Sequence, residues 1–118
     1  MPRKHRDLLV WQKSIALVTT VYRLTESFPK QEQFGLTSQM RRAAVSVPAN
    51  IAEGAARSTR KDLLHFLVVA RGSLSELDTL AAIAGNLGYL ADKDALLHEI
   101  SQVAGLLARL RSSLKDDA

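Results

Sequence analysis

The sequence contains no cysteine and no long apolar run. The first absence excludes disulfide bonds, thiolate metal sites and cysteine nucleophiles, and it favours a reducing cytoplasm. The longest apolar runs, Phe66 to Ala70 and Leu80 to Ala84, are far shorter than the roughly 20 residues that span a bilayer. Near the N-terminus Gln12 and Lys13 interrupt the apolar stretch that a secretion signal needs. We therefore expect a cytoplasmic protein without a membrane partner.

Patterns for catalysis or metal binding are also scarce. The sequence has no glycine-rich phosphate loop, and its serines lack the strand-turn-helix context of an activated nucleophile. A di-metal bundle needs paired Glu-x-x-His motifs on facing helices. The nearest match is a single Asp62-x-x-His65, and Ala95 stands three residues before His98. We expect no metal, no cofactor and no enzymatic activity.

Aromatic residues are few, whereas positive charge is in excess. Trp11, Tyr22 and Phe66 fall in apolar contexts, so they are expected in a core rather than stacked on unpaired bases. The net charge is +4 with a pI near 9.8, which favours anionic partners. Basic residues could follow a phosphate backbone if they gather on one surface, and the alternative is a merely solvated face. The candidates are Arg3, Lys4, Arg6, Arg41, Arg57, Arg60, Lys61 and Arg71.

Four segments repeat apolar residues at intervals of three and four, and none alternates with a period of two. Short connections favour an all-α, antiparallel, up-down-up-down four-helix bundle. We expect one domain over residues 1–118, with residues 1–7 as a basic tail. The predicted helices run from Leu8 to Leu24, from an N-cap at Thr37 to about Arg57, from an N-cap at Thr59 to about Leu87, and from an N-cap at Asp92 to Leu114.

Proline and glycine modify this pattern at a few positions. Pro48 lies inside the second helix and removes a backbone donor, so we expect a continuous helix that is kinked there. Gly54 and Gly72 lie inside helices, where glycine indicates a close approach of helices or of subunits. In the first loop, Phe28 and Phe34 are expected to plug the end of the core.

The first helix is apolar over more than one face. One stripe comprises Leu8, Trp11, Ile15, Val18 and Tyr22, and a second stripe comprises Val10, Leu17, Val21 and Leu24. A single small bundle cannot bury both stripes. We therefore expect a neighbouring copy of the chain to cover the second stripe, since obligate interfaces resemble a core cut in half.

A polar stripe runs along one face of the second helix, at spacings of four, four, three and four residues. Its side chains could bind an anion, or they could pair with one another along or between helices. Pairing of Glu53 with an arginine across a subunit boundary would fix the register of an assembly at little gain in stability. The stripe consists of Arg42, Ser46, Asn50, Glu53 and Arg57.

Four stretches carry an ordered set of motifs. They read DLLVWQKSIAL from Asp7, FPKQEQFGL from Phe28, QMRRAAVSVPANIAEGAAR from Gln39, and FLVVARGSLSEL from Phe66. Together they resemble the four-helix bundle proteins called 23S ribosomal RNA intervening-sequence proteins. The resemblance covers roughly residues 7 to 89, and the fourth helix matches only in general character.

The resemblance implies an antiparallel bundle that assembles into a pentameric ring. It also implies similarity to the accessory protein of diversity-generating retroelements, which binds nucleic acid, and no enzymatic activity. The motif residues are Arg41, Arg42, Asn50, Glu53, Gly54, Gly72, Ser73 and Glu76.

Two hypotheses follow. In the first, the ring pools the basic residues of several subunits and binds a nucleic acid. In the second, the helix surfaces recruit a partner polypeptide and the charge is incidental.

Overall fold

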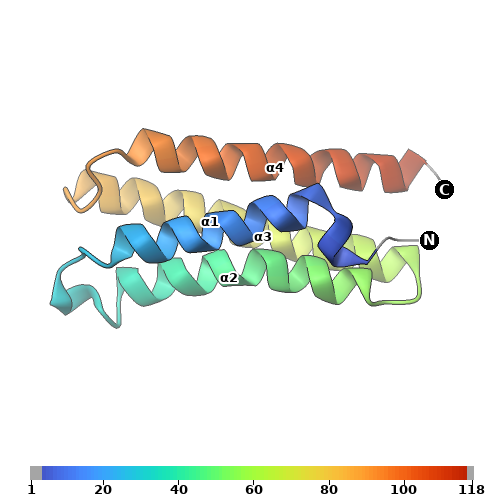
Figure 1. Cartoon of the computed structure of the whole chain (residues 1–118), viewed down its shortest axis with the longest axis horizontal. Coiled ribbons are helices and arrows are strands. Elements are labelled where there is room, and N and C mark those ends of the chain that lie inside the picture. Colours follow the sequence, from blue (N-terminus) through green and yellow to red (C-terminus); the bar gives the residue numbers. More distant parts are fainter. Residues whose placement is uncertain (1–3, 117–118) are drawn as a thin grey trace.

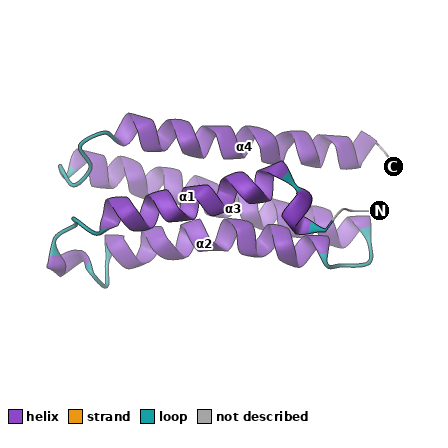
Figure 2. Cartoon of the chain, viewed as in Figure 1, coloured by secondary structure: helices purple, strands orange, loops and turns teal. Residues whose placement is uncertain are grey.

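The computed structural model describes residues 4 to 116, and these form four long helices packed side by side (Figures 1 and 2). Within this range there is no β-strand, so the prediction of an all-α four-helix bundle is confirmed. None of the helices in it has the length and apolarity that a membrane crossing requires. The elements are η1 (His5–Asp7), α1 (Leu9–Thr25), η2 (Lys30–Glu32), α2 (Leu36–Ala55), α3 (Arg60–Asn86) and α4 (Lys93–Asp116).

In Figure 1 each helix runs opposite to the one before it. Helices α1 and α3 each pack against both α2 and α4, whereas no Cα atoms of the diagonal pairs approach within 8 Å of each other in the described bundle. The bundle measures 47 × 23 × 20 Å. One end therefore collects the starts of α1 and α3 and the ends of α2 and α4. We call the half of the bundle nearest this end the terminal half.

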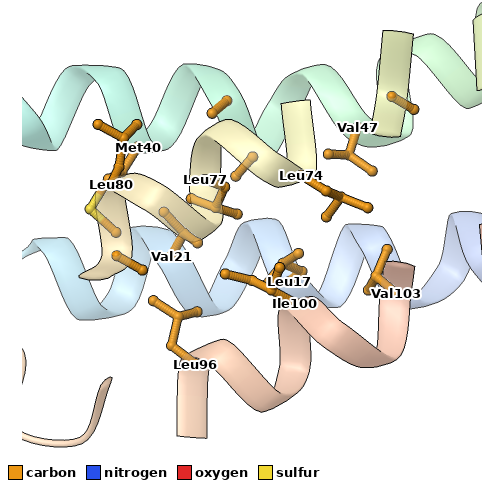
Figure 3. Packing of buried hydrophobic residues seen from close by; sticks show 14 of the residues in the cluster. Leu17, Val21, Met40, Val47, Leu74, Leu77, Leu80, Leu96, Ile100 and Val103 are labelled. Carbon is orange, nitrogen blue, oxygen red and sulfur yellow. The ribbon is translucent and has the colours of Figure 1, made fainter. Parts of the chain in front are cut away.

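The core is a single apolar cluster to which all four helices contribute residues (Figure 3). The expected apolar stripes of the second and third helices are buried throughout, and that of the fourth is buried from Leu96 to Leu107. Leu110 and Leu114 are only partly buried against the core. Figure 3 shows Leu17, Val21, Met40, Val47, Leu74, Leu77, Leu80, Leu96, Ile100 and Val103 pointing into the shared interior.

The two stripes of the first helix have the opposite arrangement to the one predicted. Val10, Leu17 and Val21 of the second stripe are buried inside the chain, so they need no neighbouring subunit. In the first stripe Leu8, Trp11 and Val18 are partly buried against the core, whereas Ile15 and Tyr22 are 40% and 42% exposed. Val45 of α2, also 42% exposed, adds to the apolar surface of these two helices. The apolar surface that α1 leaves exposed therefore belongs to the first stripe.

Buried hydroxyl groups explain the reversal. Ser14 and Thr25 complete the buried stripe, although both are polar residues. The Ser14 Oγ donates to the carbonyl oxygen of Trp11 at 2.8 Å, and the Thr25 Oγ1 donates to that of Val21 at 2.7 Å. A hydroxyl that is satisfied by its own helix can be buried at little cost. The inward face therefore reads as less apolar than the outward one.

Most helix ends follow the expected capping rules. The Thr59 Oγ1 accepts from the Asp62 N–H at 3.1 Å, and the Asp92 Oδ1 accepts from the Ala95 N–H at 3.1 Å, as predicted. Helix α3 ends at a turn in which Gly88 has a φ of 81°, a conformation that favours glycine.

The prediction that Thr37 caps the second helix is wrong. Thr37 is buried in the first turn of α2, which begins at Leu36. The Glu32 Oε1 accepts from the Leu36 N–H at 3.2 Å, so a carboxylate in the preceding loop supplies the cap. The other oxygen, Oε2, accepts from the Tyr89 hydroxyl at 3.2 Å. Desolvation and this neighbouring carboxylate raise the pKa of Tyr89 above its ordinary 10.0, so the hydroxyl keeps its proton and its bond.

The two phenylalanines of the first loop differ sharply. Phe28 is buried and packs against Tyr89 with ring centroids 5.5 Å apart, as expected of a plug. Phe34 is 88% exposed, so the prediction that it closes the core is wrong. The reason is that Phe28 and Tyr89 already fill that end of the bundle, while Glu32 ties the loop to α2.

Helix α2 continues through Pro48 without interruption, and the kink there remains a prediction. Gly54 permits a close approach: a Cβ at this position would lie 2.9 Å from the Phe66 Cβ and 3.2 Å from the Leu63 carbonyl oxygen. Gly72 is exposed, and a Cβ there would meet no atom of the described chain within 4 Å. Close packing within the chain therefore explains Gly54 but not Gly72.

This contrast predicts opposite effects for one substitution. Gly54→Ala should lower the free energy of unfolding by about 1–3 kcal/mol, because the Leu63 backbone must move. Gly72→Ala should raise it by up to about 1 kcal/mol, because alanine favours an open helix position. Urea denaturation followed by circular dichroism measures both, and a stabilised Gly54→Ala variant would contradict the packing described above.

Candidate nucleic-acid interface

Basic residues concentrate in the terminal half of the bundle. They come from η1 and α1, from both sides of the α2–α3 turn, and from the last turns of α4, which Figure 1 places at the same end. The described basic side chains of this half are Lys4, Arg6, Lys13, Arg57, Arg60, Lys61, Arg71, Arg109, Arg111 and Lys115. The described acidic residues of this half are Asp7, Glu53, Asp62 and Asp116, the last residue of α4. The terminal half therefore carries a strong positive excess.

The opposite half has the reverse balance. Its described basic side chains are Arg23, Lys30, Arg41, Arg42 and Lys93, and its acidic ones are Glu26, Glu32, Glu76, Asp78, Asp92, Asp94 and Glu99. The charge is thus not spread over one long face of the bundle. It is separated along the long axis, so a polyanion would be attracted to one end.

The N-terminal segment belongs to the terminal half, which we also call the basic end because of its positive excess. Lys4 and Arg6 fall within the segment expected to be a tail, yet His5–Asp7 forms a 3-10 turn that packs on α1 and α2. The Gln12 Nε2 donates to the Arg6 carbonyl oxygen at 2.8 Å. The Arg6 guanidinium lies 5.3 Å from the centre of the Trp11 ring. Lys4 and Arg6 remain exposed, so the turn presents charge from a fixed position; Arg3 lies outside the described residues.

The α2–α3 turn supplies three further candidates. Arg57 forms an ion pair with Glu53, with the Nη2 and Oε2 atoms 2.8 Å apart, and its guanidinium stacks 4.9 Å from the Phe66 ring centre. Both partners are about half exposed, so this pair contributes little to stability. Arg60 and Lys61 are exposed in the first turn of α3. The turn therefore places several cations at the tip of the bundle.

Arg41 and Arg71 lie elsewhere. Arg41 is in the opposite half, where its Nε donates to the Thr25 Oγ1 at 2.9 Å and its Nη2 to the Tyr22 carbonyl oxygen at 3.3 Å. Its guanidinium also lies 4.5 Å from the Tyr22 ring centre. These contacts tie α2 to the C-terminal end of α1, which is a structural role. Arg71 is exposed near the middle of α3.

Four basic residues of this end were not among the candidates from the sequence: Lys13, Arg109, Arg111 and Lys115. Lys13 and Arg109 line a groove of about 260 Å³ between α1 and α4, together with Leu9, Gln102 and Leu106. The signal was available in the topology, because an up-down bundle returns the end of its fourth helix to the side of the N-terminus. Combining that rule with the basic residues of the last turns would have found Arg109, Arg111 and Lys115.

The polar stripe of α2 faces α3. Most of its side chains pair along or between helices, which was one of the two alternatives given by the sequence. The Asn50 Nδ2 donates to the Ser46 carbonyl oxygen at 2.8 Å and to its Oγ at 2.9 Å. Ser46 Oγ and Ser73 Oγ of α3 lie 2.7 Å apart and share a hydrogen bond. Glu53 pairs with Arg57, two residues beyond the end of α2. Arg42 is exposed and forms no ion pair within the described chain.

The family of the chain follows from its sequence. A family model described as 23S rRNA-intervening sequence protein matches residues 6–109. The chain belongs to this family. The match confirms the resemblance seen in the motifs, and it extends over most of α4. No curated protein matches the sequence at a significant level.

A solved structure supports the same fold. It is the crystal structure of a protein with unknown function from the S23 ribosomal protein family of Bacteroides thetaiotaomicron. The two chains share 18% identity with a TM-score of 0.81, over 93% of this chain and 99% of that one. At this identity the likeness shows the fold alone.

Side chains suited to metal binding do not gather in the described chain. Within residues 4 to 116 no group of three histidine, aspartate or glutamate side chains is placed to hold an ion. His65 packs edge-on against Phe66 with ring centroids 5.3 Å apart. His98 lines a second groove between α1 and α4, next to Glu99 and Lys13.

Stability measurements distinguish a structural arginine from a surface arginine. Arg41→Ala should lower the free energy of unfolding by about 1–2 kcal/mol, because it removes two hydrogen bonds from a charged donor. Arg71→Ala should change it by less than about 0.5 kcal/mol, as expected at an exposed site. Thermal and urea unfolding of both variants provide the measurement. Equal effects would show that Arg41 does not hold α1 and α2 together.

Proposed function

We propose that the chain is a non-enzymatic, cytoplasmic homo-oligomer, a pentameric ring, that binds RNA or DNA backbone through its pooled terminal halves. The observation that carries the proposal is the separation of charge along the bundle. Cations from four different parts of the chain meet at one end, while acidic residues collect at the other. The absence of cysteine from the sequence fits a reducing compartment.

Phosphate groups are the ligand that suits this end. The basic side chains are mostly exposed and come from separate elements, so they form a broad positive surface rather than a pocket for one small anion. Such a surface binds a polyanion by releasing its counterions, with little dependence on base sequence. The family name also associates related proteins with ribosomal RNA, which favours RNA as the polyanion.

Assembly would multiply this charge. In a cyclic ring, every subunit is related to the next by rotation about one axis, so all terminal halves lie at equivalent positions. Several weak contacts then act together on one nucleic acid. The surface that supports assembly is the first stripe of α1 with Val45 of α2, since Ile15, Tyr22 and Val45 are each about two-fifths exposed.

A second candidate function is a scaffold that recruits a polypeptide. The observation that favours it is the apolar surface of the opposite half, where Phe34 is 88% exposed and Leu87 is 54% exposed. Neither side chain contributes to the core of its own chain. In this alternative the basic end has no nucleic-acid role, so co-purified protein rather than nucleic acid would accompany the ring.

Salt dependence tests the nucleic-acid proposal. The double variant Arg109→Gln/Lys115→Gln should bind duplex RNA or DNA more weakly. On B-DNA, the slope of log affinity against log salt should become shallower by up to about 0.9 for each phosphate that the variant no longer neutralises. Fluorescence anisotropy across a salt series measures both quantities.

The matched control removes the same charge from the other half. Arg23→Gln/Lys30→Gln should leave affinity within about twofold of the unmodified protein, because these residues lie far from the proposed surface. An equal weakening in the two double variants would reject the basic end as the binding surface. No binding by the unmodified protein at low salt would reject the nucleic-acid function itself.

Light scattering tests the assembly. The unmodified protein should have about five times the 12.9 kDa mass of one chain. Ile15→Glu should reduce this mass to that of a monomer, because a charge would be buried at the subunit contact. Val68→Glu is the control, since Val68 is also 40% exposed but lies on α3. A monomeric unmodified protein at micromolar concentration would overturn the ring.

A further inference from the structure

A polar cleft lies between α2 and α3, near the middle of the bundle and apart from the basic end. Its volume is about 350 Å³. Both helices contribute to its walls. The lining residues are Gln39, Arg42, Ala43, Ser46, Ser73 and Glu76.

Two opposite charges of this cleft have no partner in the described chain. Arg42 comes from α2 and Glu76 from α3, and both are exposed. The described part of the chain has neither an ion pair nor a hydrogen bond that occupies either side chain. The charges are thus available to a ligand, whereas the nearby Glu53 and Arg57 neutralise each other.

The serine hydroxyls of the cleft act as acceptors. The Asn50 Nδ2 donates to the Ser46 Oγ, the two serine oxygens share a hydrogen bond of 2.7 Å, and the Ser73 Oγ donates to the Val69 carbonyl oxygen at 3.3 Å. In this chain of bonds both hydroxyl hydrogens are used inside the protein. Their remaining capacity is to accept, so toward a ligand they act as acceptors like the carboxylate of Glu76 and not as donors like the guanidinium of Arg42.

This arrangement selects a particular ligand chemistry. A phosphate would be attracted by Arg42 but repelled by Glu76, so it gains little from the cleft as a whole. The cleft instead suits a small group with an acceptor edge for Arg42 and a donor edge for Glu76. Guanine has both, because O6 and N7 accept while N1–H and the N2 amino group donate. Adenine and cytosine each present a ring-nitrogen acceptor on the edge that would face the carboxylate.

We propose that this cleft binds an unpaired guanine base of the nucleic acid held by the basic end. Arg42 donates to O6 and N7, and Glu76 accepts from N1–H and the N2 amino group. The base must be unpaired because pairing occupies its N1–H and amino group. The inference rests on the proposed function. It adds a base contact, which depends on nucleic-acid sequence, to phosphate contacts, which do not.

The position of the cleft is compatible with one strand reaching both sites. Ser46 lies in α2, whose last residue is Ala55, and nine residues at about 1.5 Å each separate these two by roughly 14 Å along the helix, directly before the α2–α3 turn. A strand anchored at the α2–α3 turn can therefore place a base a few nucleotides away in the cleft.

The experiment compares short single-stranded oligouridylates bound to the full chain. One contains only uridine, and the others carry a single central guanosine, inosine or 7-deazaguanosine. The guanosine strand should bind between about fivefold and a hundredfold more tightly than the uridine strand. Inosine lacks the N2 amino group and 7-deazaguanosine lacks N7, so each should show only part of this preference.

Substitutions assign the two contacts. The Arg42→Gln variant should bind the guanosine and 7-deazaguanosine strands with equal affinity. The Glu76→Gln variant should bind the guanosine and inosine strands with equal affinity. Arg23→Gln and Asp78→Asn carry the same charge changes on exposed sites outside the cleft, and they should keep the full preference. Unchanged affinity for the uridine strand shows that each variant is folded.

The outcomes separate the two proposals. Tight binding of all four strands with equal affinity would overturn the guanine site and leave the basic end intact. A guanosine preference that survives both cleft substitutions would also overturn it. Absence of binding to every strand at low salt would reject the proposed function, and the guanine site would fall with it.

Discussion

The alternation of direction between neighbouring helices is the constraint on which the other features depend. Four amphipathic helices can share one core only if each buries its apolar stripe against its neighbours, and short connections make consecutive helices antiparallel. The same alternation decides which residues meet at each end. Residues that are far apart along the chain, such as Arg6, Lys61 and Lys115, come to one end because their helices start or finish there.

Sequence patterns predict the structure well where a helix buries one clear stripe. Helices α2, α3 and α4 each have a spaced set of apolar residues, and burial follows that spacing from Met40 to Leu107. The N-caps at Thr59 and Asp92 were equally readable, because the capping bond joins residues only three apart. Such local rules need no knowledge of the tertiary structure.

The same patterns mislead where the outcome depends on contacts between distant segments. The inward face of α1 contains Ser14 and Thr25, whose hydroxyls are satisfied by their own helix, and Arg41 of α2 adds a third bond to Thr25. Periodicity alone favours burial of the first stripe of α1, because that stripe contains a tryptophan and a tyrosine. Similarly, the cap of α2 comes from Glu32, a residue that also holds Tyr89 of a different loop. Neither arrangement is visible from the spacing of residues in one segment.

The candidate site was recognised only in part for a related reason. The basic residues near the N-terminus and the α2–α3 turn can be named from the sequence, but their positions along the chain do not show that α4 ends beside them. Nor do they show that Arg41 belongs to a helix junction rather than to a binding surface. Only the fold decides which charged side chains lie together on one surface.

The distribution of charge also argues for two different kinds of contact in one molecule. At the basic end most of the cations are exposed and they outnumber the acidic groups, so their attraction acts over about a Debye length and weakens as salt rises. In the α2–α3 cleft Arg42 and Glu76 cancel at a distance, so little long-range attraction remains and only a group with matching edges gains from entering. In the proposed function, the first kind of contact would bring a polyanion to the molecule whatever its sequence, and the second would act only after it has arrived. A bundle that keeps these two surfaces apart can therefore tune affinity and selectivity through separate residues.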